Sequence, residues 1–157
     1  ILQSRARRRG REVERLLHRH LRPAPRVAAG RTIALSGCAS AMIDISDGLS
    51  SDLAHICEQS GVGAIINEGA IPISPALKKT APLLKKFPEQ YGLSGGEDYE
   101  LLFTIPSARL GKLSARAVGA TEIGIVTNDR HMWVIDAHGR RKRLQRSGYE
   151  HFTRSAG

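Results

Sequence analysis

The stretch that decides the fold is Ala41-Met42-Ile43-Asp44-Ile45-Ser46-Asp47-Gly48-Leu49-Ser50-Ser51-Asp52-Leu53. Its apolar start predicts a buried strand over 41–45, and after Gly48 the apolar positions follow helical spacing. Asp44, Ser46 and Asp47 therefore stand where a strand is followed by a helix N-terminus. That end carries partial positive charge and free N–H groups, which suits an anion. Carboxylates alone would repel a phosphate there, whereas Mg²⁺ between carboxylate and phosphate oxygens would bridge them.

Two interpretations of this stretch stay open on its residues alone. In the first, Asp44 and Asp47 form part of a metal–phosphate site. In the second, Asp47 caps the helix and Asp44 pairs with an arginine, because aspartate is a common N-cap residue.

A second acidic stretch is Leu93-Ser94-Gly95-Gly96-Glu97-Asp98-Tyr99-Glu100-Leu101-Leu102-Phe103. Paired glycines allow the backbone to approach a ligand closely. The three acids within four residues repel one another unless they are solvated or paired with cations. Taken alone, this stretch is typical of an acidic turn before a strand.

Together with a third segment near the C-terminus, these stretches form a pattern that is specific to one enzyme family. The segments 43–53 (IDISDGLSSDL) and 93–103 (LSGGEDYELLF), followed by 148–152 (GYEHF), resemble the thiamine-monophosphate kinase family. The segments 21–27 (LRPAPRV) and 60–64 (SGVGA) also fit its pattern. The first motif is shared with aminoimidazole ribonucleotide synthetase and selenophosphate synthetase, which are the alternative assignment. The second motif and the terminal one are more particular to the kinase.

The resemblance implies ATP-dependent transfer of phosphate onto thiamine monophosphate, giving thiamine diphosphate. Family members have an N-terminal domain that builds a homodimer and supplies further metal-binding aspartates, and a C-terminal α/β domain. This chain resembles the C-terminal part, with a basic helix and linker over 1–31 and the domain over 32–157. The N-terminal domain is expected to be absent from this chain, which is therefore expected to be inactive alone.

The resemblance also assigns roles within the motifs. It places Mg²⁺ at Asp44 and Asp47, ATP at Ser46, and the thiamine substrate at Glu97, Asp98 and Tyr149. It does not separate the two adjacent acids, of which Glu97 is the first choice. A cationic thiazolium between an aromatic face and a carboxylate would be electrostatically favourable.

The amino-acid composition narrows the remaining classes of function and the expected location. The net charge is +9, and ten arginines lie within residues 1–31, so a basic nucleic-acid-binding module is a rival function. Aromatic residues make up only 4% of the chain and none lies in the basic run, which disfavours base stacking; specific nucleic-acid binding is not expected. No apolar run reaches the ~20 residues that span a bilayer. Cys38 and Cys57 do not form a metal-binding pattern, Cys57 is expected to be a buried thiol, and the cytoplasm is the expected location.

Periodicity and turn residues predict an α/β (α+β) fold, with a mixed β-sheet covered by helices. The expected strands cover 41–45, 62–67, 99–105, 122–127 and 131–136. The expected helices cover 2–21, 27–36 with a break at Gly30, 48–59 ending at Gly61, 76–80, and 107–117 capped by Ser107. Residues 83–90 are ambiguous.

Overall fold

The computed structural model describes residues 10–85, 87–113 and 118–145. Its α-helices are α1 (Arg11–Leu21), α2 (Val27–Ser36), α3 (Leu49–Ser60), α4 (Pro75–Thr80) and α5 (Pro88–Ser94). Its 3₁₀ helices are η1 (Glu68–Ala70), η2 (Ala81–Leu84) and η3 (Ser107–Lys112). Its strands are β1 (Ala41–Asp44), β2 (Gly63–Asn67), β3 (Leu101–Thr104), β4 (Gly124–Thr127), β5 (Met132–Ile135) and β6 (Arg141–Arg143).

The strands form two sheets, and the expected combination of a mixed sheet with helices is confirmed. In the first sheet, β1 and β3 are antiparallel, with Asp44 opposite Leu101. The second sheet has the order β4-β2-β5-β6. There β2 is antiparallel to β4 and parallel to β5, and β6 is antiparallel to β5. The strands β4 and β5 are neighbours in sequence, but they lie on opposite sides of β2.

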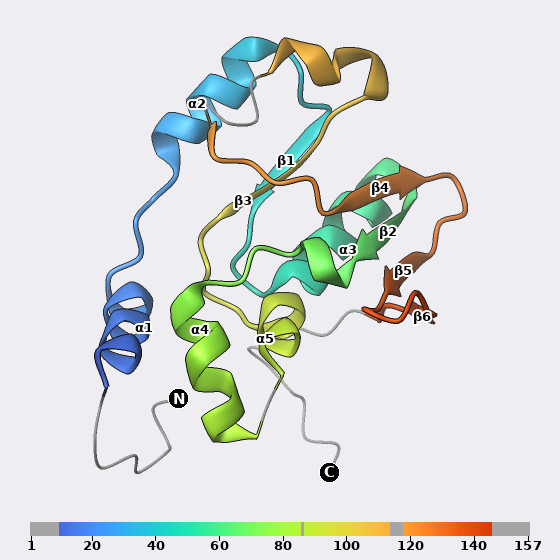
Figure 1. The fold of residues 1–157 in the computed structure, drawn as a ribbon. Coiled ribbons are helices and arrows are strands. Elements are labelled where there is room, and N and C mark those ends of the chain that lie inside the picture. The colour runs from blue at the N-terminus through green and yellow to red at the C-terminus, as the bar shows by residue number, and fades with distance from the viewer. Residues whose placement is uncertain (1–9, 86, 114–117, 146–157) are drawn as a thin grey trace, which may run out of the picture.

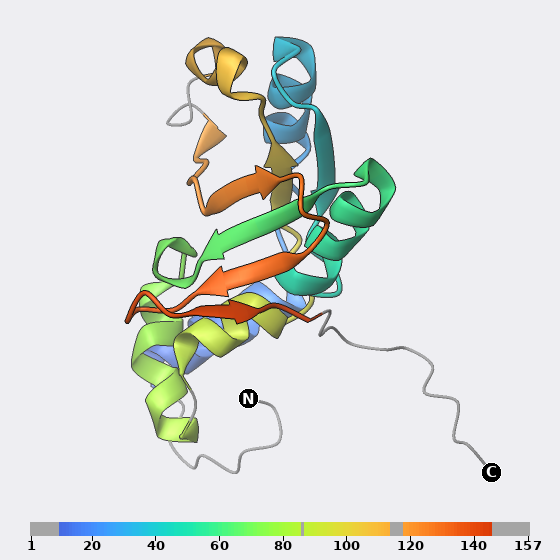
Figure 2. The ribbon, with the colours of Figure 1, turned by 90° about the vertical axis from the view of Figure 1, so that its right-hand side faces the viewer.

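The helices lie at the ends of the strands and along one side. Figures 1 and 2 show α2 and η3 at one end of the molecule, and α1, α4 and α5 at the other. Helix α3 contacts β1, β2 and β3, so it links the two sheets. The chain leaves β1 and enters β3 at the end occupied by α1 and α5 (Figure 1).

The core forms around one face of α3, as its spacing predicted. Its buried members are Leu49, Leu53, Ile56, Cys57, Ala64, Ile66, Ile71 and Leu102. Cys57 is a buried thiol, as expected, and burial raises its pKa. The helix ends at Gly61, whose φ of 65° is left-handed; glycine adopts this conformation with little strain.

Two helix predictions were wrong. Helix α2 is not broken at Gly30, because the Gly30 N–H still donates to the carbonyl of Arg26 at 2.8 Å and a glycine costs a helix only about 1 kcal/mol. Ile33, 1% exposed, anchors α2 in the interior. The segment after Pro106 is the 3₁₀ helix η3 rather than an α-helix, and the Ser107 side chain does not cap it. Residues 114–117 lie outside the described ranges.

Other boundaries moved by a few residues. The strand expected over 99–105 is confined to Leu101–Thr104, because the residues before it form a loop. The ambiguous segment 83–90 contains the end of η2 and the start of α5, which begins at Pro88. Within the described residues, no helix is both long and apolar enough to cross a membrane.

Because α3 supplies much of the core, truncating one of its buried side chains should destabilise the fold. Leu53 is 3% exposed, and we expect Leu53→Ala to lower the free energy of unfolding by about 2–5 kcal/mol. The matched control is Leu35→Ala, because Leu35 on α2 is 76% exposed and its loss should change stability by no more than about 0.5 kcal/mol. Urea unfolding followed by circular dichroism measures both, and equal effects would contradict this core.

Candidate functional site

The first motif forms the connection between β1 and α3. Asp44 is exposed at the end of β1, and Ser46 and Asp47 are half-buried in the loop that follows. The N-cap of α3 is Gly48, with φ of 112° and no side-chain cap bond. Asp47 is therefore not the cap of this helix, and one part of the structural interpretation of the motif is excluded. Within residues 10–145 as described, Asp44 makes no ion pair with an arginine either.

A buried carboxylate occupies the inner side of this loop. The N–H groups of Ser46, Asp47 and Gly48 all donate to Oδ2 of Asp52, at 3.0, 3.1 and 3.2 Å. Asp52 is only 2% exposed. The expectation that N–H groups at this end are free for an anion is thus wrong for these three. A phosphate at the loop would meet carboxylate and hydroxyl oxygens, which favours a bridging cation over direct amide binding.

The second motif lies directly against the first. Three backbone hydrogen bonds join the two loops: from Ile45 to Glu100 at 2.8 Å, from Tyr99 to Ile45 at 2.8 Å, and from Glu97 to Ser46 at 2.7 Å. Gly96 permits this approach, since a Cβ atom there would lie 2.8 Å from the Ser46 carbonyl oxygen. Two segments about fifty residues apart in sequence therefore form one site.

The second loop holds two non-glycine residues in a left-handed backbone conformation. Glu97 has φ of 65° and Tyr99 has φ of 51°. Such residues cost about 1–3 kcal/mol each and cluster at ligand-binding and active sites. This strain is independent structural support for a functional role of the segment around Glu97 and Asp98.

Cations from α1 and the residue before α2 neutralise much of this acidic loop. Arg26 forms a two-bond contact with Glu100, with Nε to Oε2 at 2.8 Å and Nη2 to Oε1 at 2.6 Å. Arg19 reaches the same carboxylate at 2.6 Å, and His20 lies 3.4 Å from Glu97. Pairing with Arg19 and Arg26 thus compensates the charge of Glu100, and the contact with Glu100 raises the pKa of Arg26.

Asp98 has a different environment. It makes no ion pair within the part of the chain that the structure describes, although Arg19 lies close enough to act on it. The residue stays accessible to solvent, but protein atoms crowd its carboxyl group. This burial raises the pKa of Asp98 to about 6, and the negative charge of Glu100 adds to the effect. The ionised and neutral forms of Asp98 are therefore both accessible near neutral pH.

An open cavity of about 1500 Å³ lies beside the joined loops. Glu97, Asp98 and Glu100 line its polar part together with Arg19, His20 and Arg26, and much of the rest is apolar. The cavity thus offers carboxylates beside hydrophobic surface, which suits an organic cation with an apolar ring.

Of the two predicted metal ligands, Asp44 and Asp47, only Asp47 lies in a cluster of possible ligand atoms. Ligand atoms of Asp47, Asp52 and His55 lie within 4.8 Å of one another, and Asp44 is not a member of this group. Carboxylate and hydroxyl oxygens are ligands that Mg²⁺ accepts, so the donors of the first loop fit this ion chemically. Figures 1 and 2 place both motif loops between α3 and α5.

Sequence reasoning missed several of these residues. Asp52 and His55 carry a detectable signal, because positions three apart on a helix share a face. The roles of Arg19, His20 and Arg26 depend on contacts between distant segments, for which the sequence offers only the excess of arginine near acidic motifs. Tyr149 lies outside the described residues, so its predicted role stays a prediction.

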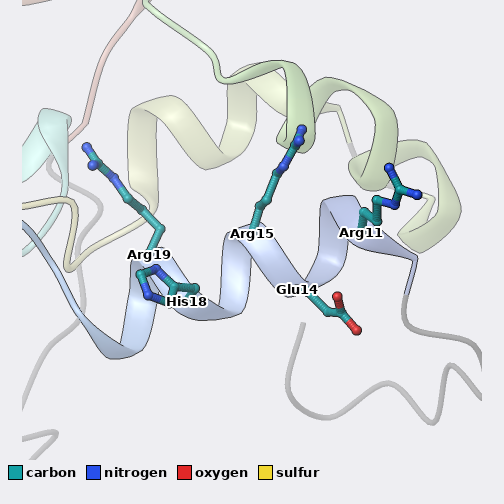
Figure 3. Close-up of a pocket in the computed structure, with 5 residues that line it drawn as sticks. All are labelled: Arg11, Glu14, Arg15, His18 and Arg19. Carbon is teal, nitrogen blue, oxygen red and sulfur yellow. The ribbon is translucent and has the colours of Figure 1, made fainter.

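A second hollow, of about 390 Å³, lies on α1 alone. Figure 3 shows its lining, in which Arg11, Arg15 and Arg19 project from positions four residues apart and Glu14 and His18 lie on another side of the helix. Only Arg19 also contacts the motif loops, through Glu100. The hollow is separate from the loops that bear the candidate metal ligands.

Comparison with known proteins shows which proteins this chain resembles. Thiamine-monophosphate kinase of Escherichia coli K12 is 40% identical over 148 residues, covering 90% of this chain and 43% of the relative. The structure of AaThiL complexed with AMPPCP and TMP matches with a TM-score of 0.80 at 33% identity, over 96% of this chain and 45% of that one. Thiamine monophosphate kinase from Aquifex aeolicus matches with a TM-score of 0.72 at 35% identity, over 85% and 42% of the two chains. The resemblance to this kinase is confirmed.

The chain spans less than half the length of these relatives. A family described as AIR synthase related protein, C-terminal domain, matches residues 4–136. The joined motif loops and all described helices and strands except β6 lie within that range, and the chain belongs to the family of AIR synthase related C-terminal domains.

Proposed function

We propose that this chain is the C-terminal part of an enzyme that phosphorylates thiamine monophosphate to thiamine diphosphate with ATP. The observation that carries the proposal is the backbone pairing of the two motif loops beside the cavity. It brings the candidate metal and nucleotide residues next to the candidate substrate acids. The similarity to thiamine-monophosphate kinases, and to a structure complexed with AMPPCP and TMP, supports the same reaction.

In this proposal the first loop binds the nucleotide. Asp44 and Asp47 hold Mg²⁺, and the Ser46 hydroxyl contacts ATP. The bound ion would neutralise charge on the phosphates, which is the main chemical demand of phosphoryl transfer. The protein's own contribution is to hold these oxygens in place.

The second loop binds the other substrate. Glu97 and Asp98 face the cavity, where a carboxylate can attract the thiazolium cation while apolar side chains pack against the rings. Glu97 stays the first choice for direct contact, as the family resemblance indicated, whereas Glu100 is already paired with two arginines. Tyr149, homodimer formation and a cytoplasmic location stay predictions from the family resemblance.

The proposal also assigns part of the active site to an N-terminal domain, which the family resemblance implies for the longer relatives. Phosphoryl transfer needs both substrates aligned, and such positioning corresponds to effective molarities of ~10⁵ M or more. The candidate ligands described here, Asp44, Asp47, Glu97 and Asp98, all belong to one domain.

We therefore expect the 157-residue chain alone to show only background turnover. A chimera in which it replaces the matching part of the Escherichia coli relative should form thiamine diphosphate, at ~1 s⁻¹ or faster if the join is sound. Chromatography of reactions with Mg²⁺, ATP and thiamine monophosphate measures both, with the unmodified relative as the positive control. Rapid turnover by the chain alone would show that no second domain is needed. A folded chimera that phosphorylates another substrate would instead support a different superfamily enzyme.

Removing one proposed metal ligand should abolish most of the chimera's activity. Asp47→Asn keeps the size of the side chain but weakens Mg²⁺ binding, and we expect turnover to fall at least about a hundredfold. The matched control is Glu58→Gln, because Glu58 is an exposed acid near the other end of α3 and its change should leave turnover intact. Circular dichroism checks the fold of both variants, and undiminished activity of Asp47→Asn would contradict the assignment.

The environment of Asp98 predicts its titration. Its carboxyl should titrate with a midpoint of about 6, so its attraction for a cation is complete above that pH and is lost as pH falls through 6. NMR of side-chain carboxyl resonances in the chain measures the midpoint. Asp129 is the internal control, since a hydrogen bond from the His131 N–H lowers its pKa. A midpoint for Asp98 near the ordinary ~3.9 would contradict the crowding of its carboxyl.

A further inference from the structure

The feature that the proposed roles leave unused is the buried carboxylate of Asp52. One oxygen, Oδ2, accepts three consecutive backbone N–H groups from the loop that carries Ser46 and Asp47. The Gly48 carbonyl in turn accepts the N–H groups of Ser51 and Asp52, both at 3.0 Å. The loop and the first turn of α3 are thus closed on each other.

Because the Asp52 carboxylate is buried, it depends on these hydrogen bonds. A carboxylate that is 2% exposed is stable only when hydrogen bonds or cations replace its water. Charge-assisted bonds from N–H groups are about twice as strong as neutral ones. Asp52 therefore holds three successive peptide groups in one orientation, and the direction of the chain at Asp47 follows from that.

The same contact reaches the second motif. The peptide group between Ser46 and Asp47 donates the Asp47 N–H to Asp52 at 3.1 Å and accepts the N–H of Glu97 on the Ser46 carbonyl oxygen at 2.7 Å. Asp52, the Ser46–Asp47 peptide group and Glu97 therefore form a continuous hydrogen-bonded chain. A shift of the first loop would thus displace the left-handed segment that contains Glu97.

We infer that Asp52 is a positioning residue that orients the metal and nucleotide loop from its buried side, and orients Glu97 through the peptide group between Ser46 and Asp47. The effect of Asp52 on metal binding rests on the proposed function, whereas its effect on the orientation of the loop does not. In this role Asp52 acts through the backbone by its Oδ2 atom; direct contact with the ion, together with Asp47 and His55, is the alternative that the tests separate from it. The partner groups of Asp52 are amides, which already occupy the oxygen that faces the loop.

The first test uses the metal-free chain. In ¹⁵N-labelled protein with EDTA, the amide protons of Ser46, Asp47 and Gly48 should be protected from exchange in the unmodified chain. Asp52→Asn removes the charge with little change in size, and we expect exchange at these amides and at Glu97 to accelerate at least about tenfold. Fast exchange in the unmodified chain would overturn the inference without any variant, even if Asp52→Asn fails to fold.

The second test measures metal binding. Mn²⁺ titrated into the chain with ATP, followed by electron paramagnetic resonance, should bind about 10–100-fold more weakly to Asp52→Asn, as expected when a group that orients a ligand is lost. Asp136→Asn is the matched control: Asp136 is 9% exposed and accepts the N–H groups of His138 and Arg140. It should lower thermal stability while leaving Mn²⁺ affinity and exchange at Ser46 unchanged.

The outcomes separate the two proposals. If Mn²⁺ with ATP does not bind the unmodified chain, the proposed nucleotide role of this loop loses support, and the exchange experiment alone decides the role of Asp52. If Asp52→Asn loses stability but keeps both loop protection and Mn²⁺ affinity, the inference is overturned. Loss of Mn²⁺ affinity with the loop amides still protected would also overturn it, since Asp52 would then act as a direct ligand.

Discussion

The antiparallel pairing of β1 with β3 is the interaction on which the candidate site depends. The pairing is only four residues long in each strand, but backbone hydrogen bonds continue it beyond the strands into both motif loops. Because backbone register determines which residues lie opposite each other, Asp44 and Glu100 arrive at the same end of the molecule. Neither acidic stretch would form a site without the other.

Charge balance is the second requirement of this arrangement. The joined loops gather several carboxylates, and uncompensated they would repel one another. Asp52 is compensated by amides and Glu100 by two arginines. Asp44, Asp47 and Asp98 make no such ion pairs within the described residues, and these are acids to which the family resemblance assigns ligands. Asp52 and Glu100 are thus distinguished by their partners from these three acids, while Glu97 lies 3.4 Å from His20.

Local patterns predicted much of the fold but not the internal contacts of the site. The spacing of Leu49, Leu53 and Ile56 indicated the buried face of α3, and the strand at 41–45 was nearly correct because apolar runs report burial directly. Gly30 misled, since tertiary packing of α2 outweighs the modest cost of a glycine. The hydrogen-bond acceptor of the amides of Ser46 to Gly48 could not be predicted, because periodicity in the sequence does not show which backbone groups a buried carboxylate contacts.

The attachment of α1 has a consequence for the cavity. This helix has no fully buried residue, and within the described residues its side-chain ion pairs to other elements are exposed, such as those from Glu12 to Lys79 and from Arg19 to Glu100. Exposed pairs contribute at most about 1 kcal/mol each, and mobile ions screen them over a Debye length of about 8 Å at physiological ionic strength and about 3 Å at 1 M. High salt should therefore weaken the ion pairs at this wall of the cavity, while the packing of α1 on α4 and the core around α3 do not depend on them.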